Sequence, residues 1–376
     1  MHAGARMNFG PLPRFTGTSP MLGFGAWAVG GSGWGEGPSG QNDAAEHEAA
    51  VRHAADRGIT WFDTAPTYGN GASEILLGRV LRERREAIAI ATKVGPRDDP
   101  RASLEASLRR LGSEYVDLLQ LHEALPGWEA QLEQLHKLQE QGKARAIGLC
   151  NATHLQIERA TEIAPIATYQ GAYNLFDRDA EEREIPMCQK HGLGFVAYRP
   201  LASGLLSGKY SAASAPIFAA GDHRSAIYWF KGAEFARRQQ VIERLRPIAQ
   251  RAGLTLAALA LAWVYSRPGV NIVLAGARSV EQVDQNLAGA MRLESEIVRS
   301  IDAIVAAQFT PARATPTAHA AAATWGERER FIVARLDGRI RYEAIAAEWT
   351  DRGDKPMIAA QVKVFVDRLA EQGLVA

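Results

Sequence analysis

The sequence predicts an α/β protein with a (β/α)8 TIM barrel, and two patterns support this prediction. Short apolar runs recur along the chain, and each ends at a polar residue or a glycine. Longer segments with helical spacing of apolar residues separate them, and most of these close with a glycine that suits a helix C-cap. Near-continuous apolar strands alternating with helices indicate a parallel sheet buried on both faces, and eight such units make a barrel.

The expected strands follow one another at a spacing close to thirty residues through the first half of the chain. They are MLGFGAW near 21–27, GITWFD at 58–63, AIAIATK at 87–93, YVDLLQLH at 115–122, ARAIGLCN at 144–151, IATYQ at 166–170, GFVAYRP at 194–200 and VNIVLAG at 270–276. The amphipathic segments between them include 43–58, 101–112, 128–143 and 181–192. This order of strand and helix gives the barrel its eight units.

Composition excludes several classes of protein. The 376 residues are 47% hydrophobic and carry a formal charge of +1, so the chain can bury a core but has no overall field for nucleic acid or an anionic membrane. The two cysteines, Cys150 and Cys188, offer no disulfide framework and no metal site. The N-terminus lacks an apolar secretion signal, and we find no apolar run of about 18 residues. We therefore expect a cytoplasmic protein without a metal.

Polar residues stand at the ends of five successive predicted strands. They are Asp63, Lys93, His122, Asn151 and Gln170. Catalytic groups of such barrels lie at the carboxyl ends of the strands, so these residues are expected to meet on one rim. A role in stability alone would not require polar groups at the barrel mouth.

Tyr68 and three of these residues can form an acid site. An unperturbed phenol holds its proton at neutral pH, and a nearby Lys93 ammonium would lower the pKa of Tyr68. Asp63 would pair with Lys93, and His122 would orient a substrate carbonyl. Because no nucleophile or metal is present among these groups, the electrons would arrive as hydride from a cofactor.

Residues 20 to 305 resemble the aldo-keto reductases. The segments that carry the resemblance are GITWFDTAPTYGNGASEILLG, IATKVG, VDLLQLH, YQGAYNLFDR, YRPLASGLLSGKY and GARSVEQVDQN. The resemblance implies that Asp63, Tyr68, Lys93 and His122 form the catalytic tetrad of that family, with Tyr68 as the general acid. It also implies reduction of a small-molecule aldehyde or ketone with NADPH, which lies across the barrel mouth without a Rossmann domain.

The resemblance assigns cofactor contacts as well. It implies that Asn151 and Gln170 hydrogen-bond the nicotinamide carboxamide and that Tyr198 stacks on the nicotinamide ring. The segment LASGLLSGK would pass along the pyrophosphate, with contacts from Leu201, Gly204, Leu205 and Lys209.

The segment after the eighth strand is expected to hold the 2′-phosphate. Ser279 followed by Gln282 is a capping-box pattern, and a helix N-terminus with Arg278 beside it suits a phosphate. The alternative is that Ser279 only caps the helix. Many relatives have a basic residue in place of Gln282, which weakens the preference for NADP over NAD. Gly276 and Asn286 complete the expected cofactor contacts.

The position of Trp27 and the function of the chain each have alternatives that stay open. Trp27 either forms a wall of the substrate pocket or packs in the core. The chain is expected to be an NADPH-dependent reductase, and the alternatives are a nucleotide-sensing regulatory barrel or a tailoring reductase that its C-terminal part recruits to a peptide or protein.

The sequence changes character after the predicted barrel at residues 1–306. Residues 307–324 are rich in Pro, Ala and Thr and are predicted to be a linker. Residues 325–376 predict a small helical, winged-helix-like module that resembles the peptide-binding modules of the pyrroloquinoline quinone peptide chaperone type. An oligomerisation or packing role is the alternative. Nine acidic and nine basic side chains leave this segment no basic face for nucleic acid.

Overall fold

The computed structural model describes residues 21–30, 43–211, 215–218 and 221–308, together with Val362 and Val366. The chain divides into two units, residues 1–302 and 303–376. The predicted module at 325–376 lies outside the described residues except for the two valines, and so does the predicted linker beyond residue 308. The predicted domain boundaries therefore stay predictions.

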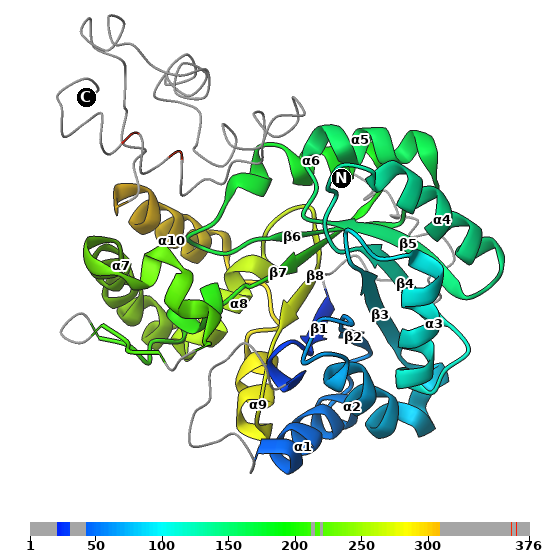
Figure 1. Cartoon of the computed structure of the whole chain (residues 1–376). Coiled ribbons are helices and arrows are strands. Elements are labelled where there is room, and N and C mark those ends of the chain that lie inside the picture. Colours follow the sequence, from blue (N-terminus) through cyan, green and yellow to red (C-terminus); the bar gives the residue numbers. More distant parts are fainter. Residues whose placement is uncertain are drawn as a thin grey trace, which may run out of the picture. The chain divides into compact units, whose positions relative to one another are not determined.

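Eight parallel strands close into a barrel in chain order, which confirms the predicted fold (Figure 1). Strand β1 pairs with both β2 and β8, so the sheet has no free edge. The strands are β1 (Met21–Gly25), β2 (Trp61–Asp63), β3 (Ala89–Val94), β4 (Val116–Leu121), β5 (Ala144–Cys150), β6 (Thr168–Ala172), β7 (Gly194–Tyr198) and β8 (Val270–Ala275).

The helices follow the strands and surround the barrel (Figure 1). The described α-helices are α1 (Asp43–Asp56), α2 (Ala72–Leu81), α3 (Pro100–Leu111), α4 (Trp128–Glu140), α5 (His154–Ile163), α6 (Glu184–His191), α7 (Gly232–Arg251), α8 (Leu256–Tyr265), α9 (Val280–Ala288) and α10 (Ser295–Gln308). Short 3-10 turns occupy Ala28–Gly30, Arg82–Ala87, Asp179–Glu181, Ala202–Ser207, His223–Ala226 and Tyr228–Phe230. The helix expected at 181–192 begins later, at Glu184, because the chain enters it through the turn at Asp179–Glu181.

Local sequence explains where several helices begin and end. The Asp99 side chain accepts a hydrogen bond from the Ala102 amide, and Pro100 takes a position at the helix start where no amide hydrogen is needed. The same helix, α3, ends at Gly112, whose φ of 60° is left-handed. These caps hold α3 in the register that its apolar face requires.

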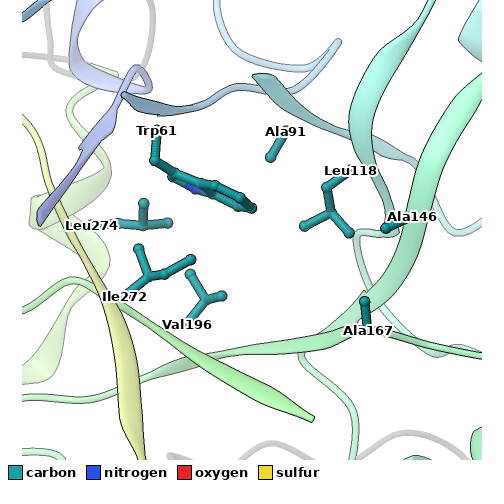
Figure 2. Packing of buried hydrophobic residues seen from close by; sticks show 8 residues of the cluster. All are labelled: Trp61, Ala91, Leu118, Ala146, Ala167, Val196, Ile272 and Leu274. Atoms are coloured by element: carbon teal, nitrogen blue, oxygen red, sulfur yellow. The ribbon is translucent and has the colours of Figure 1, made fainter. Parts of the chain in front are cut away.

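The lower barrel interior is an apolar layer (Figure 2). Its buried side chains come from six of the strands and from the residue that precedes β6. They are Trp61, Ala91, Leu118, Ala146, Ala167, Val196, Ile272 and Leu274. Side chains of a strand alternate between its two faces, so the residue two positions further on also points inward. On β2, β3 and β4 these next residues are Asp63, Lys93 and Gln120, and all three are buried. The barrel therefore carries a polar layer directly above the apolar one.

Within the part of the chain that the structure describes, no single helix is long and apolar enough to cross a membrane. Helices α7 and α8 are together long and apolar enough, but the chain bends by 85° at the break between them.

Candidate active site

A cavity of about 620 Å³ opens at the carboxyl ends of the strands. Every predicted site residue except Leu205 and Ser279 contributes to its lining. These residues are Trp27, Asp63, Tyr68, Lys93, His122, Asn151, Gln170, Tyr198, Leu201, Gly204, Lys209, Gly276, Arg278, Gln282 and Asn286. Leu205 is fully buried and does not contribute to the lining.

Lys93 connects the acidic and phenolic groups of the cavity. Its Nζ donates to Asp63 Oδ1 at 2.6 Å, to the Thr64 carbonyl at 2.8 Å and to the Tyr68 hydroxyl at 3.2 Å. Lys93 and Asp63 are almost completely buried. A buried ion pair is favourable only when further hydrogen bonds satisfy both partners, as they do here.

Burial and charge act against each other in this pair. Burial lowers the pKa of Lys93, but the Asp63 carboxylate and Tyr68 outweigh it, so the pKa ends above its ordinary value. Burial raises the pKa of Asp63, and the Lys93 ammonium with the Gln170 and Gln120 amides opposes that rise. Lys93 therefore keeps its proton and presents an ammonium to Tyr68.

The pKa of Tyr68 differs from the sequence-based expectation. Burial raises it to about 12, although the Lys93 ammonium acts to lower it. The expectation of a lowered pKa was wrong, because desolvation of the phenolate exceeds the attraction of the ammonium. Tyr68 is therefore fully protonated at neutral pH and is poised to donate.

His122 lies against the edge of Tyr68. The ring centroids are 5.9 Å apart with an interplanar angle of 73°. Burial and the nearby Lys93 lower the pKa of His122 to about 3. The imidazole is therefore neutral at physiological pH and can offer one donor and one acceptor.

Gln170 faces Asp63 as well as the cavity. Its Nε2 donates to Asp63 Oδ2 at 3.2 Å, and its Oε1 accepts from Gln120 Nε2 at 3.2 Å and from the Cys150 thiol at 2.9 Å. Burial raises the pKa of Cys150, so this thiol stays protonated and acts as a donor. Sequence reasoning did not identify Gln120, because a single glutamine inside an apolar strand carries no motif.

Asn151 and Tyr198 hold each other at the cavity wall. The Tyr198 hydroxyl donates to Asn151 Oδ1 at 2.7 Å, and Asn151 Nδ2 donates to the His122 carbonyl at 2.9 Å. Asn151 adopts a left-handed φ of 50°, which asparagine tolerates better than most residues. Among the described residues, Asn151 Nδ2 donates to the His122 carbonyl alone, so its second hydrogen can serve a ligand.

The turn after β7 is strained where it meets the cavity. Arg199, Ala202 and Ser203 have φ values of 57°, 50° and 57°, and Gly204 has a φ of 87°. Each left-handed residue other than glycine costs on the order of 1–3 kcal/mol and persists where its surroundings fix it. Asn174 Nδ2 donates to the Arg199 carbonyl at 3.1 Å and so helps to fix this turn. Such outliers cluster at ligand sites.

One end of the cavity is strongly cationic. The lining includes Lys209, Arg224 and Arg278. Burial and the two neighbouring guanidinium groups lower the pKa of Lys209. Arg224 comes from the loop before α7, where it pairs with Asp222 and donates to the Tyr210 hydroxyl at 3.2 Å. Sequence reasoning missed Arg224, because an isolated arginine in a loop gives no pattern.

The segment before α9 forms a helix cap beside this cationic end. Ser279 Oγ accepts a hydrogen bond from the Gln282 amide at 3.3 Å, so Ser279 caps α9. Ser279 does not line the cavity. The Gln282 side chain accepts from the Arg278 amide at 2.9 Å instead of completing a capping box. Asn286 is buried and donates to the Gly276 carbonyl at 3.1 Å.

Aromatic rings line the cavity beside Tyr68. The Trp27 ring lies 6.3 Å from Tyr68 and 4.3 Å from His223, measured between centroids. Trp27 is partly exposed and lines the cavity together with His223 and Ile227. The structure therefore supports the pocket-wall reading of Trp27 over core packing. Among the described residues, no group of three or more His, Cys, Asp or Glu side chains could hold a metal ion.

Comparisons with known proteins agree with this geometry. Residues 21–306 match the model of the aldo/keto reductase family. The chain is similar to aldo-keto reductase YhdN of Bacillus subtilis, at 34% identity over 280 residues that cover 70% of this chain and 82% of that protein.

Two solved structures are similar to it as well. One is a glycerol dehydrogenase from Gluconobacter oxydans, with a TM-score of 0.68 and 33% identity over 76% of this chain and 91% of that chain. The other is an aldo/keto reductase from Klebsiella pneumoniae in complex with NADP and acetate, with a TM-score of 0.61 and 28% identity over 77% of this chain and 93% of that chain. The chain belongs to the aldo/keto reductase family.

Proposed function

We propose that this protein reduces a small aldehyde or ketone to an alcohol with NADPH, and that Tyr68 is the general acid. The observation that carries the proposal is the position of Lys93 Nζ, which donates to both Asp63 and Tyr68 inside the cavity. A protonated phenol beside a fixed ammonium is suited to give a proton to an oxygen that gains negative charge.

Each of the four residues has a distinct role in this proposal. Tyr68 donates its hydroxyl proton to the carbonyl oxygen as that oxygen becomes an alkoxide, which is a stronger base than a phenolate. The Lys93 ammonium stabilises the phenolate that remains, and Asp63 keeps Lys93 in place. His122 is neutral and can donate a hydrogen bond that orients the carbonyl.

The described residues fit NADPH. The cavity lining includes five cationic side chains against the single carboxylate of Asp63, and these cations are Lys93, Arg199, Lys209, Arg224 and Arg278. Such an excess of positive charge favours an anionic ligand. The relative from Klebsiella pneumoniae was solved with NADP, which supports this choice of ligand.

The chain holds the two ends of the cofactor with different groups. Lys209, Arg224 and Arg278 would bind its phosphates, with the strained turn after β7 along the pyrophosphate. Asn151 and Gln170 would hold the nicotinamide carboxamide through their remaining amide hydrogens, and Tyr198 would pack against its ring. When bound, NADPH supplies the hydride that reduces the carbonyl carbon.

The test is a set of steady-state assays with a panel of aldehydes and ketones, which follow the loss of NADPH absorbance. We expect turnover with at least one class of carbonyl compound. Titration of NADPH into the protein measures cofactor affinity separately.

A nucleotide-sensing barrel is the rival function, and the same two measurements separate it from a reductase. Tight NADPH binding without oxidation by any carbonyl compound would favour the sensor. A recruitment role for residues 325–376 is a separate proposal with support only from their sequence.

A further inference from the structure

We propose that Gln120 is a positioning residue of this active site: it fixes the direction of the Gln170 amide and thereby maintains the hydrogen bond that Gln170 donates to Asp63. The consequence for turnover rests on the proposed function, whereas the consequence for the titration of Asp63 does not.

The carboxylate determines the direction of both amides. An ionised Asp63 can only accept hydrogen bonds, so Gln170 must turn its Nε2 toward Asp63 Oδ2, at 3.2 Å. The Oε1 of Gln170 then points the other way, and Gln120 must present its own Nε2 to it, also at 3.2 Å. Reversal of either amide would place two acceptors against each other.

The position of Gln120 is specified by the barrel. It lies on β4 two residues after Leu118, so its side chain rises from the apolar layer into the polar layer, where it is 1% exposed. On the neighbouring strand, a Cβ on Gly148 would come within 3.4 Å of Gln120 Cγ and 2.5 Å of Thr168 Oγ1. Glycine at position 148 thus makes room for Thr168, and Gln120 packs beside this glycine at an ordinary contact distance.

Cys150 supplies a second donor to the same acceptor. Its thiol donates to Gln170 Oε1 at 2.9 Å, and it is fully buried. Two donors on one oxygen leave Gln170 a single favourable orientation, with one Nε2 hydrogen on Asp63. The thiol acts here as a hydrogen-bond donor, because burial raises its pKa.

The effect on Asp63 has a definite sign. The titratable groups that face Asp63 are Lys93, Tyr68 and Cys150. Of these, only Lys93 is charged at neutral pH and stabilises the carboxylate, and the Gln170 and Gln120 side chains stabilise it further. Replacement of Gln120 removes its own contribution and also releases the Gln170 amide, so the pKa of Asp63 must rise. Cys150 donates to Gln170, so its variants isolate the positioning effect.

The experiment compares Gln120→Met with Thr168→Val. Methionine is similar in length to glutamine but cannot donate to Gln170. Thr168 is fully buried beside the same glycine, and its Oγ1 has no hydrogen-bond partner among the described residues, so valine removes a buried polar atom outside the Gln120–Gln170–Asp63 chain. The primary measurement is the pH titration of the Asp63 carboxyl carbon by NMR, assigned with Asp63→Asn.

We expect Gln120→Met to raise the midpoint of Asp63 by about one pH unit, which is the scale of a lost hydrogen bond to a charged group. Thr168→Val should leave the midpoint in place. If the wild-type protein reduces carbonyls, the acidic limb of kcat/KM should move upward by the same amount in Gln120→Met, because Asp63 must be ionised to hold Lys93. A wild-type protein without turnover would contradict the proposed function, while the NMR titration would still test the positioning role.

Cys150 variants give an independent check if Gln120→Met folds poorly. Cys150→Ala removes one donor and should raise the midpoint by less than the methionine variant does, whereas Cys150→Ser keeps a donor and should restore the wild-type value. An unchanged midpoint in both Gln120→Met and Cys150→Ala would overturn the proposal. Equal shifts in Gln120→Met and Thr168→Val would overturn it as well, since they would indicate a general packing effect.

Discussion

The two layers of the barrel interior differ in chemistry although the same strands build them. The lower layer, formed by Trp61, Ala91, Leu118 and their neighbours, is apolar and buried (Figure 2). Two residues further along β2, β3 and β4, the upper layer consists of buried polar and charged side chains. The lower layer removes apolar surface from water, whereas the upper layer keeps ionised groups dry at a cost that its hydrogen bonds offset.

The apolar layer also helps to hold the Asp63–Lys93 pair in place. The Asp63–Lys93 pair cannot relax into solvent, because the apolar layer closes the barrel beneath it. A substitution in one layer should change stability, and a substitution in the other should change chemistry.

The largest expected effect is that of Tyr68→Phe in the proposed reaction. It removes the proton donor, so kcat should fall by about 10²- to 10⁴-fold, the usual contribution of a general acid. NADPH binding should stay nearly the same, because the phenol makes little of the cofactor site. Single-turnover rates and an NADPH titration check both statements. A variant that keeps more than about a tenth of wild-type turnover, with chemistry rate-limiting, would exclude Tyr68 as the acid.

Leu118→Ala tests the lower layer. Leu118 is fully buried, so its truncation should lower the free energy of unfolding by about 2–5 kcal/mol. Urea unfolding measures this loss. The folded fraction should keep its pH profile and most of its turnover, since Leu118 belongs to the apolar layer and the titrating groups belong to the polar one. A displaced pH profile would show that the two layers are not separable.

Arg278→Ala tests whether Arg278 contacts the 2′-phosphate of NADPH. It should weaken NADPH by about 10- to 100-fold, the scale of one lost charge-assisted hydrogen bond, because Arg278 is proposed to meet a phosphate that NADH lacks. NADH affinity should change much less. Fluorescence titrations with both nucleotides compare the two losses, and equal losses would contradict a contact with the 2′-phosphate.

The pH dependence of carbonyl reduction should be flat over a wide range. The pKa of His122 is lowered to about 3, so the ring gains charge only in strong acid. The pKa of Tyr68 is raised to about 12, so the acid is lost only as pH rises toward that value. We therefore expect neither His122 nor Tyr68 to produce a transition in kcat/KM, which reports the free enzyme, from about pH 6 to about pH 9, and the acidic limb to follow Asp63. A transition near the ordinary histidine pKa that His122→Gln abolishes would contradict this.

The smallest effect is expected from truncation after Gln308. All eight strands and the described helices precede that point, so the shortened chain should fold and bind NADPH as before. Light scattering and NADPH titration compare the two lengths. A change in assembly size would assign residues 309–376 to subunit contacts, and lost NADPH binding would show that the barrel needs them.

Much of this protein could be predicted from its sequence because the relevant signals are local. Strand ends follow from where apolar runs stop, and they placed Asp63, Lys93 and Gln170 at the carboxyl end of the barrel, where the structure also has them. Helix ends follow from caps such as Asp99 and Gly112. In a barrel the carboxyl ends of all strands lie on one rim, so residues at these ends are brought together.

Features that depend on residues far apart in the chain could not be predicted from the sequence. The Gln170 amide is oriented by Asp63, 107 residues away, and by Gln120, 50 residues away. Arg224 reaches the cavity from a loop with no motif, and Leu205 turns into the core although its neighbour Gly204 faces the cavity. The pKa of Tyr68 was misjudged for the same reason: the sequence names the charges near a group, but burial, which here outweighs them, is known only when the whole barrel has closed.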